Sequence, residues 1–261
     1  MMPSRRLAFG LLAAFGLALG GLSPVAAADG QGLTAEEIAA RIAAAPGRPA
    51  EDAARDAGRK PAEVLAFLGL ASGMTVVDVW AAGGWYTEVL AAAVGPDGKV
   101  YAQNIPALLQ MRNGVNEQAL AARLADGRLT NVARIDTDLD RSELAPGSVD
   151  LAITALNFHD VYNARGAEAA TAFLVSIHRV LKPGGVLGII DHTGVPGADN
   201  EKLHRIDPAL VPPVAEAAGF VVEARSEVLA NPADDKSLLV FDPSVRGNTD
   251  RFVYRLRKPA E

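Results

Sequence analysis

Reactive side chains follow two segments of the chain that read as buried strands. The sequence Asn-Phe-His-Asp-Val-Tyr-Asn at 157–163 follows the first, and Asp191-His192 ends the second, with His204 twelve residues further on. Because imidazole titrates near neutral pH, a histidine suits proton removal from a nucleophile. We predict His159 as the first choice of general base and His192 as the second. Asp160 or Asp207 would orient an imidazole, and His204 would contact substrate.

Two other interpretations of the same histidines are possible, as metal ligands or as structural residues. A mononuclear site made from His159, His192, His204 and an aspartate would suit zinc or iron, which accept imidazole and carboxylate ligands. The sequence holds no local metal motif such as H-E-x-x-H, so we assign no metal ligand. In the other reading, each histidine caps a strand-end loop. The fourth histidine, His178, falls within a helix and is predicted to be structural.

A glycine pair and two arginine-rich segments add binding chemistry. Gly83 and Gly84 lie between a β-branched run and a helix, where glycine lets backbone approach a ligand closely. Their spacing is not the G-x-G-x-x-G fingerprint, which argues against a nicotinamide oxidoreductase. The segments 55–61 and 241–251 are predicted to close over the site. Arg246 and Arg251 would bind an anionic group bidentately, or would instead pair with Asp242 and Asp250.

These residues need a sheet to bring them together, and the chain alternates strand and helix patterns. Five βα alternations imply an α/β fold: a doubly wound, mostly parallel, seven-stranded sheet with an antiparallel edge hairpin and N-terminal helices. Ligands in such sheets bind at the carboxyl ends of the strands. Strands are expected over 75–80, 100–103, 132–135, 149–154, 186–190, 220–225 and 252–256. Helices are expected over 34–45, 52–68 with an interruption near 58–61, 87–94, 108–124, 167–181 and 208–218.

Composition narrows the classes of function. The 261 residues include 25 basic and 31 acidic side chains, a formal charge of −6, which argues against broad nucleic-acid binding. The absence of cysteine excludes disulfides, thiolate metal sites and cysteine nucleophiles. We expect a small-molecule substrate, and the sequence predicts no oligomeric state.

The N-terminus has the pattern of a secretory signal. Arg5 and Arg6 precede an uncharged run over 7–22, and Ala26-Ala27-Ala28 supplies a small-residue cleavage site. We predict cleavage near Ala28 and an exported, periplasmic protein that does not interact with the membrane after cleavage. An uncleaved membrane anchor is the alternative. The predicted division is a signal peptide over 1–28, a helical extension over 29–60 and an α/β domain over 61–261.

Several motifs occur in an order that resembles the class I S-adenosylmethionine-dependent methyltransferases. They are Val-Val-Asp-Val at 76–79 with its glycine turn, Gly-Pro-Asp-Gly-Lys-Val-Tyr-Ala at 95–102, Gly-Ser-Val-Asp-Leu-Ala-Ile at 147–153, His-Arg-Val-Leu-Lys-Pro-Gly-Gly at 178–185 and Ala-Ala-Gly-Phe at 217–220. The resemblance covers residues 61–256. More narrowly, Gly-Gly-Trp-Tyr-Thr at 83–87 and Arg-Gly-Asn-Thr-Asp-Arg-Phe at 246–252 resemble a group of exported methyltransferases.

The resemblance implies S-adenosylmethionine as cofactor and a Rossmann-like methyltransferase fold. Asp78 matches the acid that holds the cofactor's amino acid portion, and Gly83 and Gly84 match the later part of the glycine loop beside Trp85. Trp80 and Ala82 replace two customary glycines. Asn104 stands where the family places an acid on the ribose. Asp138, or Asp136, matches the acid near adenine, and Asn157 borders the transferable methyl group.

The implied function is methyl transfer to an unknown acceptor. The alternative is a non-catalytic ligand-binding protein on the same fold, because S-adenosylmethionine is made in the cytoplasm and an exported protein would lie outside its supply. A histidine-based metal enzyme is the third reading.

Overall fold

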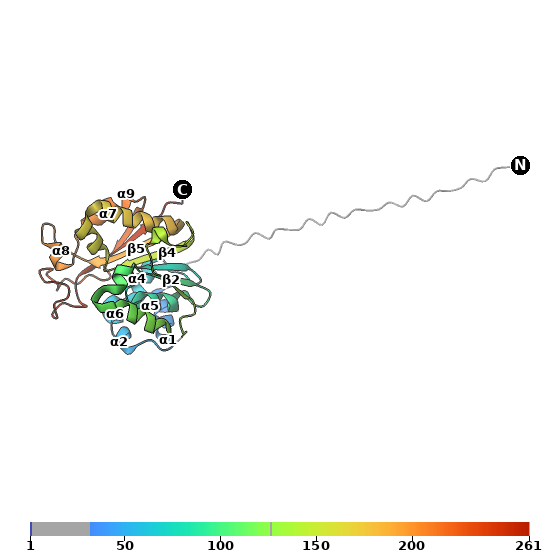
Figure 1. Cartoon of the computed structure of the whole chain (residues 1–261), viewed down its shortest axis with the longest axis horizontal. Coiled ribbons are helices and arrows are strands. Elements are labelled where there is room, and N and C mark those ends of the chain that lie inside the picture. Colours follow the sequence, from blue (N-terminus) through green and yellow to red (C-terminus); the bar gives the residue numbers. More distant parts are fainter. Residues whose placement is uncertain (2–31, 126, 261) are drawn as a thin grey trace.

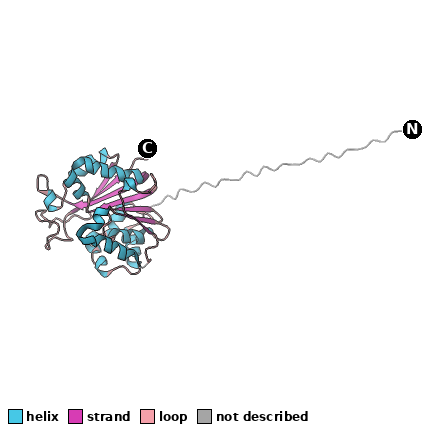
Figure 2. Ribbon diagram, in the orientation of Figure 1, coloured by secondary structure: helices cyan, strands magenta, loops and turns pink. Residues whose placement is uncertain are grey.

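The computed structural model describes residue 1, residues 32–125 and residues 127–260. The predicted cleavage site near Ala28 and the uncharged run before it lie outside the described residues. A seven-stranded sheet runs through the centre of the molecule with helices on both faces (Figure 1; Figure 2). Its strands are β1 (Thr75–Val79), β2 (Lys99–Gln103), β3 (Val132–Ile135), β4 (Val149–Ala155), β5 (Leu181–His192), β6 (Val221–Ser226) and β7 (Arg251–Arg257).

The strand order is β3-β2-β1-β4-β5-β7-β6. The first five strands pair in parallel, and β7 pairs antiparallel with both β5 and β6. The strand order reverses between β1 and β4: β2 and β3 follow β1 towards one edge of the sheet, and β5 follows β4 towards the other. The carboxyl ends of these two parallel neighbours therefore border a crevice of the kind in which ligands bind in open α/β sheets. The predicted doubly wound sheet and its antiparallel edge hairpin are confirmed.

One face of the sheet is covered by helices from the first half of the chain. They include α1 (Ala35–Ala44), α2 (Ala50–Ala53), α3 (Asp56–Arg59), α4 (Pro61–Leu68), α5 (Trp85–Val94) and α6 (Pro106–Ala125). A capping box fixes the start of α1: the Glu37 amide donates to Thr34 Oγ1 (3.2 Å), and the Thr34 amide donates to Glu37 Oε2 (2.8 Å). Ile38 and Ile42 then join a buried cluster with α4, α5 and β1.

The opposite face carries α7 (Phe158–Val180) and α9 (Val211–Ala217), which lie on the other side of the strands in Figure 1. Three short helical segments complete the described chain: η1 (Leu139–Arg141), α8 (Asn200–Leu203) and η2 (Pro208–Leu210). His178 on α7 lies edge-on to Phe220, with ring centroids 5.0 Å apart, which fits the packing role predicted for it. Within the described residues, the helices are too short or too polar to span a bilayer.

Some predicted boundaries were confirmed and others were wrong. The interruption expected near 58–61 is confirmed, because Lys60 takes a left-handed conformation (φ 42°) before Pro61 starts α4. The part before it is two short helices, α2 and α3, and not one. The helix expected at 108–124 is α6, which is broken over 111–114 by non-helical backbone. The helix expected over 167–181 is confirmed as the part of α7 that follows a kink at Gly166 (φ 77°), and the helical segment before the kink, from Phe158, was not predicted. His159 and Asp160 therefore lie in the first turn of α7 and not in a loop.

Candidate functional site

A cavity of about 840 Å³ opens at the carboxyl ends of β1 and β4. Its wall combines the β1–α5 turn, α6, the segment around α2 and α3, and one residue of the long β6–β7 connection. This volume lies within the usual range for small-molecule sites. The lining includes Asp52, Arg55, Arg59, Asp78, Trp80, Gly83, Trp85, Arg123, Asn157 and Arg246.

Asp78 lies at the base of this cavity, near the end of β1. Its side chain is 3% exposed, and Oδ2 accepts a hydrogen bond from Thr87 Oγ1 (2.7 Å). Burial raises the pKa of Asp78 to about 7, against the hydrogen bonds from Thr87 and the positive charge of Arg59. A ligand that brings a positive charge to this carboxyl group would favour its ionised form.

The turn between β1 and α5 adopts left-handed backbone at three residues, Trp80 (φ 56°), Ala82 (φ 50°) and Gly84 (φ 81°). Asn104 stabilises it from β2: its Oδ1 accepts from the Ala82 amide (2.8 Å), and its Nδ2 donates to the Ala82 carbonyl (3.2 Å). Asn104 is fully buried and is not among the residues lining the cavity. The structure therefore places this predicted cofactor residue under the turn.

Gly83 and Gly84 allow α6 to approach the turn closely. A Cβ atom on Gly83 would lie 2.9 Å from the Ala119 Cβ, and one on Gly84 would lie 2.9 Å from Leu120 Cδ1. The contact with the Ala119 Cβ requires glycine at position 83, whereas at position 84 the Leu120 side chain could shift and it is the left-handed backbone (φ 81°) that favours glycine. The sequence analysis singled out this pair for close approach to a ligand and did not predict its contact with α6.

Trp80 separates two groups of predicted cofactor residues. It lines the large cavity, and it also lines a smaller one of about 310 Å³ with Gln103 and Asp138. Its indole packs edge-on against Phe173 of α7, with ring centroids 5.3 Å apart. Asp78, Gly83 and Asn157 line the large cavity, whereas Asp138 lines the smaller one.

Arginine side chains dominate one wall of the large cavity. The Arg59 guanidinium lies 4.5 Å from the Trp85 ring centroid and donates no hydrogen bond to any of the residues that the structure describes. Burial, together with the positive charge of Arg55, lowers the pKa of Arg59 to about 10. Arg59 belongs to the arginine-rich segment that the sequence predicted to close over the site, although no role was assigned to it.

Arg123 is a lining residue that sequence reasoning missed. It reaches from α6 to the Gly83 carbonyl (Nε, 3.0 Å) and to Asp52 Oδ2 (Nη2, 2.6 Å), and it pairs with buried Glu88 on α5. Asp52 in turn accepts from Arg55, and its carbonyl accepts from Trp85 Nε1 (3.0 Å). This network links α2, α5 and α6 around the cavity. No local motif in the sequence marks the role of Arg123, because its partners lie 35 to 71 residues from it along the chain.

The predicted catalytic histidine, His159, lies in a separate cluster. Its amide donates to Asp191 Oδ2 (2.7 Å), and its Nδ1 lies 2.7 Å from Asp191 Oδ1. On its other side, Nε2 lies 3.2 Å from Asp160 Oδ1 and 3.3 Å from His204 Nδ1. Burial opposes protonation of His159, but the carboxylates of Asp191 and Asp160 outweigh it and raise the pKa of His159 to about 10.

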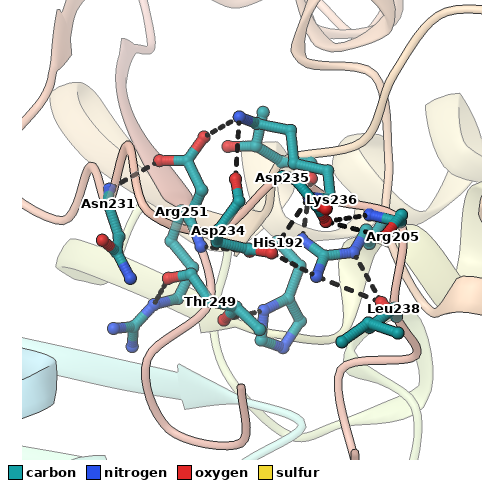
Figure 3. A network of polar contacts seen from close by, with 12 residues as sticks. His192, Arg205, Asn231, Asp234, Asp235, Lys236, Leu238, Thr249 and Arg251 are labelled. Carbon is teal, nitrogen blue, oxygen red and sulfur yellow. Dashed lines mark hydrogen bonds and ion pairs between the residues drawn. The ribbon is translucent and has the colours of Figure 1, made fainter. Parts of the chain in front are cut away.

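His192 is held apart from this cluster by the β6–β7 connection. Its Nδ1 lies 2.7 Å from Thr249 Oγ1, and burial together with the charge on His159 lowers the pKa of His192 well below its usual range. Figure 3 shows the network that continues from here into the connection. At its centre, fully buried Arg205 makes two hydrogen bonds to Asp234, at 2.8 and 3.1 Å. This pair fixes residues 234–238 beside the end of β5.

The two predicted substrate-binding arginines have different positions. Arg246 is exposed and lines the large cavity. Arg251 is 6% exposed and does not line it; its Nη2 donates to the Gly58 carbonyl (2.7 Å) and its Nε donates to the Thr249 carbonyl (3.2 Å). Neither arginine forms an ion pair with Asp242 or Asp250 in the described part of the chain. Arg251 thus ties the C-terminal hairpin to α3.

Residues 77–189 match the family model described as "Methyltransferase domain". The matched segment runs from β1 through β5, so it contains Asp78, the glycine turn and the His159–Asp160 pair. A search of curated proteins gives no match to the chain.

Solved structures share the architecture at low sequence identity. An S-adenosylmethionine-dependent methyltransferase from Aquifex aeolicus is 24% identical, with a TM-score of 0.56 over 76% of this chain and 89% of that one. An arsenic(III) S-adenosylmethionine methyltransferase from Chlamydomonas reinhardtii is 18% identical, with a TM-score of 0.52 over 85% and 73%. The cyclase SpnF is 19% identical, with a TM-score of 0.54 over 82% and 84%. These likenesses show the fold, and the cyclase illustrates that one fold supports different reactions.

Proposed function

We propose that this protein transfers a methyl group from S-adenosylmethionine to a small-molecule acceptor. The proposal starts from the match of residues 77–189 to the methyltransferase family and from the class I S-adenosylmethionine-dependent methyltransferase fold. The observation that carries the proposal is the buried Asp78 carboxyl group beneath a cavity whose wall also holds Arg59. An acid and an unpaired guanidinium at one cavity suit a ligand that carries both an ammonium and a carboxylate group.

The residues present fit this cofactor at its amino acid end. Asp78 would hold the ammonium group, and Arg59 would hold the carboxylate; the Trp85 ring supplies an apolar part of the wall. When bound, S-adenosylmethionine supplies an electrophilic methyl group on a sulfonium centre. Asn157 positions the edge of the site, because its Nδ2 donates to the carbonyls of Trp80 (3.1 Å) and Ala155 (3.0 Å) and so joins the ends of β1 and β4.

In this proposal the protein acts mainly by aligning the methyl donor with the acceptor and by excluding water from the site. Alignment of donor and acceptor accelerates an in-line displacement without a protein nucleophile. None of the described residues lining the large cavity is a histidine. The role of His159 as general base, with His192 second, therefore stays a prediction, and Arg246 is the predicted substrate residue that the cavity wall includes.

Calorimetric titration of the full chain with S-adenosylmethionine tests the proposal. Arg59→Met should weaken binding by roughly 10- to 100-fold, since a hydrogen-bonded charged contact contributes about 1.5–3 kcal/mol. Arg257→Met is the matched control, because Arg257 pairs with Glu223 on the hairpin surface and should leave affinity unchanged. Release of S-adenosylhomocysteine with a cell extract as acceptor source would support the transferase; binding without product would support the non-catalytic alternative.

We also propose that the protein is exported after cleavage near Ala28. The sequence of residues 1–28 supports this through its arginine pair, uncharged run and alanine cleavage site. Cell fractionation, with mass determination of the N-terminus of the purified protein, tests it. A chain that keeps residues 1–28 and remains with the cytoplasm would contradict export.

A further inference from the structure

Three potential metal ligands converge at the start of α7, beside the loop that follows β5. His159 Nε2, Asp160 Oδ1 and His204 Nδ1 form a nearly regular triangle: the three distances between them are 3.2, 3.3 and 3.3 Å. His204 reaches the other two from the C-terminus of α8, where its backbone is left-handed (φ 53°). A strained residue thus supplies the third donor.

The size of this triangle fits a metal ion. Zinc binds imidazole nitrogen and carboxylate oxygen at about 2.0–2.2 Å, and neighbouring donors on a tetrahedral ion of that bond length lie roughly 3.3–3.6 Å apart. The three atoms therefore already have the spacing of one tetrahedral face. Two imidazoles and one carboxylate form a set that suits zinc or iron more than magnesium or calcium.

A second, independent feature is the group behind His159. Asp191 is fully buried and lies 2.7 Å from His159 Nδ1, the ring nitrogen that faces away from the triangle. A carboxylate in this position fixes the imidazole tautomer so that Nε2 offers its lone pair, an arrangement typical of metal-bound histidine. The second bond, from the His159 amide to Asp191 Oδ2, fixes the ring orientation as well.

We propose that His159, Asp160 and His204 bind one divalent transition-metal ion, zinc in the first instance. The set differs from the one considered from sequence in lacking His192, which contacts Thr249 Oγ1 instead, and its aspartate is Asp160. None of the three ligands lines the large cavity, so this site goes beyond methyl transfer and does not depend on it.

The site is open on one side. The Asp160 side chain is 50% exposed and that of His204 is 38% exposed, whereas His159 is buried. The Phe241 ring, itself exposed, lies 5.1 Å from the His204 ring and borders the open side. Three protein ligands leave the fourth tetrahedral position for water or for a donor atom of a ligand, as in zinc sites that act on substrates.

Equilibrium dialysis against zinc chloride tests the site. The full chain, purified without a histidine tag and stripped with a chelator, should bind one zinc ion per chain without S-adenosylmethionine. Cobalt(II) in place of zinc should give the strong visible absorption of a tetrahedral site with nitrogen and oxygen ligands. A failure of zinc binding would leave cofactor binding unaffected, so the two proposals fail separately.

Variants of the two exposed ligands assign the binding to this cluster. His204→Ala and Asp160→Ala should each weaken zinc binding by more than roughly tenfold, and circular dichroism checks that both variants fold. His178→Gln is the matched control. It also removes a histidine, but His178 packs against Phe220 and does not belong to the cluster. Zinc binding that is absent from the full chain, or that survives both ligand variants, would overturn the proposal.

Discussion

At the scale of single residues, protonation of Asp78 makes the stability of the folded chain depend on pH. Its carboxyl group has a pKa raised to about 7 by burial, against 3.8 for an ordinary aspartate. Between these values the folded chain keeps a proton that the unfolded chain loses. Stability therefore falls as the pH rises from about 4 to about 7 and is level above that range, with a slope from this group of at most about 1.4 kcal/mol per pH unit.

The substitution Asp78→Asn isolates this effect. It should remove that slope, so that the variant gains stability relative to the native chain as the pH rises from 5 to 8. Urea unfolding at several pH values measures the difference. Asp97→Asn, at an exposed turn, is the control and should leave the slope unchanged. A native-minus-variant difference that is constant with pH would contradict the raised pKa.

Trp80 limits the space available to a cofactor. Its indole borders both cavities, and its left-handed φ of 56° is a conformation that glycine adopts without strain. Trp80→Gly should join the cavities and tighten S-adenosylmethionine binding by roughly tenfold, equivalent to about 1.4 kcal/mol. Calorimetric titration measures it, with Phe173→Leu as a control that keeps the indole. Weaker binding by Trp80→Gly would mean that the indole itself contacts the cofactor.

At the scale of elements, the turn that contains Gly83 packs closely against α6. Gly83→Ala should destabilise the chain by about 1–3 kcal/mol, because the new methyl group meets the Ala119 Cβ. Ala119→Gly makes room for it, at about 1 kcal/mol for glycine in a helix. The double variant should therefore be more stable than the sum of the two single effects predicts, as unfolding of all four chains would measure. Strict additivity would contradict the contact.

The Arg205–Asp234 pair anchors the β6–β7 connection. Both side chains are almost completely buried, so Arg205→Met leaves a carboxylate without its partner and should cost about 3–5 kcal/mol. Arg257→Met breaks a pair that is about one-third exposed and should cost at most about 1 kcal/mol. Denaturant unfolding compares the two variants. Equal losses would show that the buried network in Figure 3 does not hold the connection.

The sequence predicted the elements well where the pattern was local. The β-branched run at β1, the capping box of α1 and the turn before β2 each contain their own signal within ten residues. The break in α6, with left-handed backbone at Arg112 and Asn113, and the helical segment of α7 before the kink at Gly166 were missed. The separation of His159 from the cavity was missed because it depends on the buried partner Asp191, 32 residues further along the chain.

At the scale of the whole molecule, the cavity is closed by parts of the chain that lie far apart in sequence. Residues from Gly47 to Arg59 form one wall, and Arg246 adds to the rim. Two long-range contacts tie these parts together: Lys60 Nζ donates to the Val228 carbonyl (2.9 Å), and Arg251 Nη2 donates to the Gly58 carbonyl (2.7 Å). Ligand binding should therefore stabilise both the N-terminal helices and the C-terminal hairpin.

Hydrogen exchange with and without S-adenosylmethionine tests this coupling. A ligand that binds the folded state stabilises it by about 2.7 kcal/mol at 100 times its Kd, and it slows local opening most where it makes contact. Backbone amides of α2, α3 and residues 246–251 should gain protection together, whereas those of α9 and β6, on the opposite face and at the sheet edge, should change least. Protection confined to residues 77–189 would show that the N-terminal helices and the C-terminal hairpin do not form part of the site.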